Sequence, residues 1–76
     1  MDIKQKFGIA IRNRRKELGI SQEELAMRIN TDSNDKSKYA DQAYISKIEL
    51  GQANVTLVTV EEICVALDVS VAEVFE

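Results

Sequence analysis

Residues 21–26 read Ser-Gln-Glu-Glu-Leu-Ala, and residues 44–51 read Tyr-Ile-Ser-Lys-Ile-Glu-Leu-Gly. Ser21 and Glu24 have the spacing of a capping box, which predicts that a short helix begins at this serine. A second helix is predicted to end at Gly51, because glycine accepts the positive φ that often follows a helix. Small and apolar residues stand where the two helices would cross. The two segments therefore predict short helices that pack closely together.

This layout is typical of a helix-turn-helix, in which one helix braces a second that enters the DNA major groove. Outside it, the chain predicts a first helix over residues 3–18 and two helices that begin after caps at Thr56 and Ser70. The two central helices are expected over residues 21–29 and 41–50. From Asn30 to Ala40 there is no apolar periodicity, so we expect a loop, unless its last turn extends the following helix backward.

Apolar residues at helical spacing predict which side chains form the core. The expected inward residues are Ile3, Phe7, Ala10, Ile11, Leu18, Leu25, Ala26, Ile29, Ile45, Ile48, Leu57, Val60, Ile63, Cys64 and Leu67. We expect Cys64 to act as a small core hydrophobe rather than as a reactive thiol.

The composition limits the protein class. Its 76 residues make a single domain over 1–76, without proline and with four aromatic residues, which suits an all-α fold. The chain has one cysteine and no histidine. This composition excludes a disulfide framework, a zinc site and a Cys–His catalytic pair. We expect no metal, no cofactor and no enzymatic activity. No apolar run spans a membrane, so a cytoplasmic protein is expected. A prokaryotic, phage or plasmid origin is a separate expectation.

The net charge of −3 is unevenly distributed. All ten basic residues lie between Lys4 and Lys47, whereas the residues from 51 onward include five acids and no base. This asymmetry is compatible with a basic docking face and an acidic far side. Mixed surface charge explains it equally well.

Several spaced motifs together resemble the Xre/Cro–C1 family of helix-turn-helix regulators. They are Arg15 to Gly19, residues 21–26, residues 44–51, Asn54 and residues 66–70. Residues 41–46 and 54–56 also resemble controller proteins of restriction–modification systems. The resemblance implies a compact, lambda-repressor-like domain of five helices whose second and third helices form the helix-turn-helix.

The chain departs from the family pattern in its turn. Ala26 and Ile45 are nineteen positions apart, where the family pattern has about ten. The enlarged turn within residues 30–40 costs only ~0.6 kcal/mol per doubling of loop length, so the fold need not suffer.

The resemblance implies which side chains contact DNA. Four residues of the third helix are candidates for base readout: Gln42, Ala43, Ser46 and Lys47. Phosphate contacts are implied for Gln22, Tyr44 and Asn54, and two lysines of the enlarged turn, Lys36 and Lys38, are speculative additions. Solvated surface is the alternative for the four readout residues and for the two loop lysines. Half-buried packing is the alternative for Tyr44. Arg15 and Glu49 match family positions that pair across helices and hold the recognition helix at its angle.

One short helix reads too few base pairs to select a site in a genome, so a homodimer on a palindromic operator is expected. The last helix offers Val71, Val74 and Phe75 as a dimer interface, with core packing an equal alternative. A second function class is an antitoxin-type interaction module that also binds DNA. Partners besides double-stranded DNA, such as a toxin or RNA polymerase, stay open.

Overall fold

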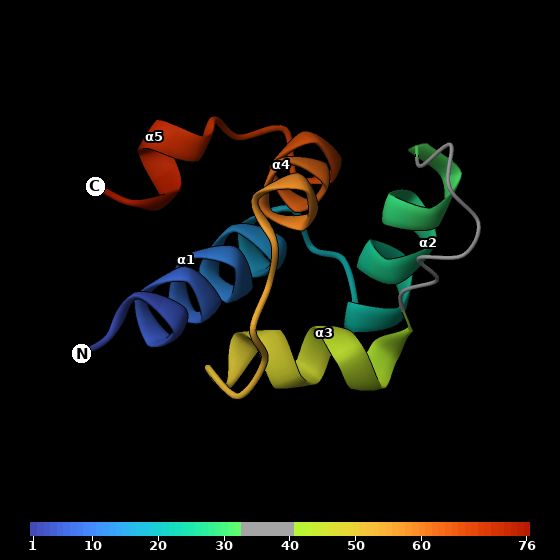
Figure 1. Cartoon of the computed structure of the whole chain (residues 1–76). Helices are drawn as coiled ribbons and strands as arrows, with labels where there is room; N and C mark the ends of the chain where they lie inside the picture. Colours follow the sequence, from blue (N-terminus) through green and yellow to red (C-terminus); the bar gives the residue numbers. More distant parts are fainter. Residues whose placement is uncertain (33–40) are drawn as a thin grey trace.

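The computed structural model describes residues 1–32 and 41–76, and these contain five helices (Figure 1). They are α1 (Ile3–Glu17), α2 (Gln22–Asp32), α3 (Gln42–Glu49), α4 (Leu57–Ala66) and α5 (Val71–Val74). The all-α fold class that the sequence predicts is confirmed.

Side-chain caps fix where the helices begin. Asp2 and Gln5 form a complete reciprocal capping box at α1. At the other helices a cap oxygen accepts the backbone N–H three residues on, and the caps are Ser21, Asp41, Thr56 and Ser70. All these starting points were predictable from sequence.

Three helices end in the same hydrogen-bonded turn. After α1, Ile20 N–H donates to Arg15 O and Gly19 N–H donates to Lys16 O, at 3.2 and 3.0 Å. This is a Schellman motif, and Gly19 supplies its φ of 70°. Gly51 has the same role after α3, with a φ of 74°.

Asp68 ends α4 in the same way with a φ of 53°, a conformation in which non-glycine residues are uncommon. Arg14 of α1 stabilises this end, since its guanidinium donates to Leu67 O at 3.0 Å and to Asp68 O at 3.2 Å. Arg28 of α2 reaches Ala66 O at 3.5 Å. The last turn of α4 has no basic residue of its own. Its C-terminus receives cationic donors from two other helices instead.

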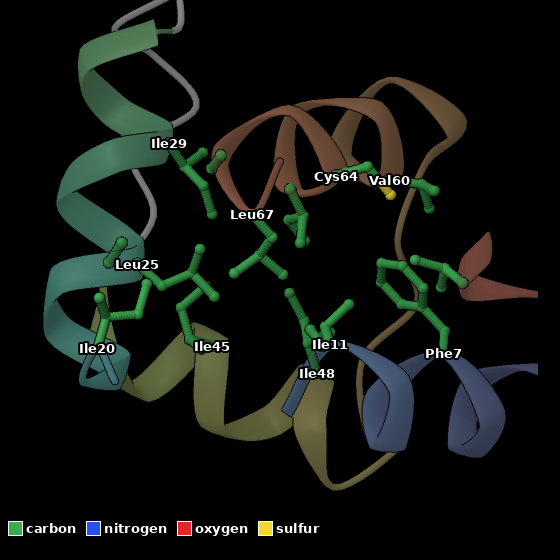
Figure 2. Close-up of a cluster of buried hydrophobic side chains, with 14 residues drawn as sticks. Phe7, Ile11, Ile20, Leu25, Ile29, Ile45, Ile48, Val60, Cys64 and Leu67 are labelled. Carbon is green, nitrogen blue, oxygen red and sulfur yellow. The ribbon is translucent and has the colours of Figure 1, made fainter. Parts of the chain in front are cut away.

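The core lies where α1, α2, α3 and α4 face one another, with α3 packed against both α1 and α2 (Figures 1 and 2). Ile11, Leu25, Ile45, Ile63 and Leu67 are each fully buried. Cys64 is buried among them, and this burial raises the pKa of its thiol. Its predicted role as a core residue is confirmed.

Three residues predicted to be buried are exposed instead: Ile3, Leu18 and Leu57. Each stands at the end of a helix, in a turn that no neighbouring helix covers. Ile3 and Leu57 line an open groove of about 360 Å³ between the starts of α1 and α4. The periodicity that predicted their burial indicates the correct helix face but not how far along the helix the core extends.

The predicted end of α2 at Ile29 is also wrong. The helix continues to Asp32, so the first residues of the predicted loop are helical. The rest of that prediction, residues 33–40, lies outside the described residues.

The last helix closes the domain against α1. Val74 is buried, and the Phe75 ring stacks on Phe7 with centroids 5.6 Å apart. No helix in residues 1–32 and 41–76 is long and apolar enough to cross a membrane.

Candidate nucleic-acid interface

The helix α3 presents one polar face. Ile45 and Ile48 point into the core, whereas Gln42, Ala43 and Lys47 are exposed. Ser46 is half-buried beside them. The structure thus brings the four residues predicted for base readout onto one side of a short helix that lies at the edge of the fold (Figure 1).

Two of the residues predicted to contact phosphate belong to α3 or to the loop that follows it. Asn54 is exposed in the loop after α3, and Tyr44 is half-buried, with its ring packed against the core. Lys36 and Lys38 lie outside the described residues.

A buried carboxylate fixes α3 from behind. Glu49, the last residue of α3, is 7% exposed. Its Oε2 accepts from Arg15 Nε at 2.7 Å and its Oε1 accepts from Arg15 Nη2 at 3.1 Å. Arg15 also donates from Nη1 to Ile20 O at 2.9 Å. This bidentate pair ties the end of α1 to the end of α3 and to the chain that enters α2.

The ion pair has a clear electrostatic consequence. The hydrogen bond from Arg15 to Glu49 raises the pKa of the guanidinium above its ordinary value, although burial opposes this effect. A group whose pKa is raised contributes stability below its unfolded pKa and loses it only above that value. Because arginine titrates far above neutral pH, Arg15 stays charged throughout the physiological range.

Gln22 lies in the same network rather than free on the surface. Its Nε2 donates to Glu49 Oε1 at 3.0 Å, and the residue is half-buried. The predicted contact of Gln22 with phosphate stays a prediction, but part of its donor capacity is already used within the protein.

Comparisons with known proteins decide the family. A helix-turn-helix domain family matches residues 6–76. The chain belongs to the helix-turn-helix family. Control protein C.MunI from Mycoplasma sp is similar to this helix-turn-helix domain, with 37% identity over 75 residues that cover 97% of this chain and 89% of that protein. The resemblance to helix-turn-helix regulators found in the sequence is confirmed.

Sequence reasoning missed two residues that position the helices of this helix-turn-helix domain. Gly8 lies where α1 crosses α3 at such short range that a Cβ there would meet the backbone of Ile48 and Glu49. An isolated glycine inside a helical pattern often has such a packing reason, and that was the available signal. Arg14 of α1 donates to the end of α4, and the sequence contains no local signal for these partners.

The predicted dimer residues have different environments. Val74 is 6% exposed and belongs to the core, so the alternative interpretation as a core residue holds for it. Phe75 is half-buried on Phe7, and Val71 is exposed. The Val74 side chain thus packs inside the monomer, and Val71 and Phe75 are the more accessible of the three predicted interface residues.

Proposed function

We propose that this helix-turn-helix regulator binds a specific DNA sequence by inserting the polar face of α3 into the major groove. The observation that carries the proposal is the contrast between the two sides of α3. Its outward side offers Gln42 and Lys47 to a ligand, while Glu49 on the inward side is held by a buried ion pair. A helix fixed in this way presents its side chains at a constant angle, as base readout requires.

The outward side chains have the chemistry for base readout. The Gln42 amide can pair with adenine N6 and N7, and the Lys47 ammonium can donate to guanine O6 or N7. The Ala43 methyl suits the thymine methyl group. Ser46 can donate to either kind of base edge. In the loop after α3, Asn54 is positioned to donate to a phosphate, which contributes affinity rather than sequence preference.

Replacing Gln42 or Lys47 by alanine is expected to weaken binding to the preferred site by about 1–3 kcal/mol and to relax selection at one base position. Fluorescence anisotropy with a preferred duplex and its single-base variants measures both effects. Gln52→Ala and Lys16→Ala are the matched controls, because both residues are exposed outside α3. If both α3 variants keep the base preference of the wild type, the two side chains have no role in readout.

We propose that the regulator acts as a homodimer on a palindromic operator. The groove that Ile3 and Leu57 line also includes the Phe75 ring, so apolar surface gathers at one flank of the domain. The groove also reaches Ile48 of α3 and Asn54 of the loop that follows it. A second copy docked on this flank would place its own α3 along the same DNA face, as two half-sites require.

Leu57→Asp is expected to give a monomer with unchanged helicity. Leu57 is 87% exposed in one chain, so the aspartate disturbs no core contact, whereas it places a charge in the proposed interface. Sedimentation velocity and circular dichroism measure the two properties. Val65→Asp, at an exposed site of α4 outside the groove, is the control and should remain dimeric. A Leu57→Asp protein that sediments as an intact dimer excludes this flank as the interface.

The likeness to a control protein supports a narrower proposal, that the chain regulates the genes of a restriction–modification system. The narrower proposal is tested by placing the promoters of neighbouring nuclease and methyltransferase genes before a reporter. Expression that responds to this protein supports it, and expression that does not respond contradicts it.

A further inference from the structure

Three helices meet at one carboxylate in the interior of this domain. The side chain of Glu49 is 3% exposed and that of Arg15 is 11% exposed. Together the donors from α1 and α2 give the Glu49 carboxylate three hydrogen bonds of 2.7, 3.0 and 3.1 Å. Two come from Arg15, and the third comes from the Gln22 amide.

The third bond connects parts of the fold that Arg15 does not connect. Gln22 is the first residue of α2, and Glu49 is the last residue of α3. Arg15 holds α3 against α1, and its bond toward α2 ends at Ile20 O, two residues before that helix begins. The side-chain contact from Gln22 to Glu49 therefore fixes the start of α2 directly to α3.

We propose that Gln22 is a positioning residue for DNA recognition, which sets the angle of α3 against α2 through Glu49 rather than serving as a simple phosphate contact. The amide is planar, so a hydrogen bond from one N–H to Glu49 also fixes where its remaining atoms point. Without that bond, one oxygen of a buried carboxylate loses a donor, and among the described residues the remaining side-chain hydrogen bonds to Glu49 come from Arg15.

The proposal rests on the DNA-binding function proposed above. A positioning role and a phosphate contact predict different effects when Gln22 is lost. A lost phosphate contact from a neutral side chain such as Gln22 weakens all DNA sequences alike and leaves the free protein unaffected. A lost positioning contact destabilises the free protein, weakens the preferred site more than other sequences, and leaves the number of phosphate contacts unchanged.

The test is Gln22→Ala, with Gln42→Ala as its matched control. Both glutamines are the first residue of a helix after a capping residue, but Gln42 is exposed. We expect Gln22→Ala to lower the thermal midpoint of the free protein by about 4–8 °C, and Gln42→Ala to leave it nearly unchanged. Differential scanning calorimetry without DNA measures this effect.

The DNA arm uses a selected duplex and an unrelated duplex over a range of salt concentrations. For Gln22→Ala we expect roughly tenfold weaker binding to the selected duplex, less than about twofold on the unrelated one, and a wild-type salt slope. Asn54→Ala shows that the assay detects a lost phosphate contact, since it should weaken binding to both duplexes by a similar factor.

A second variant tests the contact with Glu49 itself. Gln22→Glu places a carboxyl beside the Glu49 carboxylate, with Arg15 the cation that faces both. The like charge raises the pKa of the introduced carboxyl, so the folded state keeps a proton that the unfolded state has released. Its destabilisation relative to wild type therefore grows as pH rises above about 4.3 and shrinks on acidification. For Gln42→Glu we expect no such decrease on acidification in the difference in stability from wild type.

The proposal stands if Gln22→Ala lowers both the thermal midpoint and the preference for the selected duplex. It also requires that acidification reduces the difference in stability between Gln22→Glu and wild type. It is overturned by an unchanged thermal midpoint of Gln22→Ala, or by equal losses of affinity for both duplexes. It is also overturned if the difference in stability between Gln22→Glu and wild type does not shrink on acidification. A wild-type protein that binds neither duplex contradicts the proposed function instead, and the calorimetric arm tells the two failures apart.

Discussion

Gly8→Ala is expected to lower the free energy of unfolding by about 1–3 kcal/mol. In an ordinary helix the same substitution stabilises the protein by roughly 1 kcal/mol, because alanine is the better helix former. The sign reverses here because a Cβ on Gly8 would meet the carbonyl oxygen of Ile48 and lie 2.7 Å from that of Glu49. Both are backbone atoms, so relief requires α1 and α3 to separate.

Urea denaturation followed by circular dichroism measures this effect. Asn13→Ala is the control, since Asn13 is exposed on the same helix and alanine there should be neutral or slightly stabilising. A Gly8→Ala protein as stable as the wild type would show that α1 and α3 do not cross as closely as the structure has them.

Glu49→Ala is expected to lower the free energy of unfolding by about 3–5 kcal/mol, because it leaves the Arg15 charge buried without its partner. This is the largest effect expected of any single substitution proposed. The loss includes the anchor of α3, so specific DNA binding should fail even where the protein remains folded. Chemical denaturation and binding to a selected duplex measure the two losses.

A double variant separates the two roles of the pair. Arg15→Met with Glu49→Leu removes both charges, so its stability should exceed that of Glu49→Ala, since apolar replacement of a buried pair is often neutral. Its DNA selectivity should stay reduced, because the bidentate geometry is gone. A double variant no more stable than Glu49→Ala would contradict the explanation by an unpaired charge.

Local chemistry made much of the fold predictable from sequence. The caps at Asp2, Ser21 and Asp41 act within three residues, and the glycine turn at Gly51 acts within five. Arg15 and Glu49 are far apart in sequence, and only the resemblance to a family connected them.

The features that the sequence could not predict depend on contacts between distant segments. The hydrogen bond from Gln22 to Glu49 joins residues 27 positions apart, and the bonds from Arg14 to the end of α4 join residues more than 50 apart. Likewise, helical periodicity predicted that Leu57 faces inward. Its exposure follows from the absence of a covering helix among the described residues. Tertiary packing, rather than local pattern, decides such positions.

The central claim is that α3 reads a specific DNA sequence from a two-fold symmetric protein, and selection of bound duplexes from a random pool tests it most directly. The account predicts an enriched sequence with two inverted half-sites, whose centres lie about one helical turn or a multiple of it apart. It also predicts that Gln42→Ala relaxes base selection at the same position of both half-sites. A pool in which no sequence is enriched would contradict the claim.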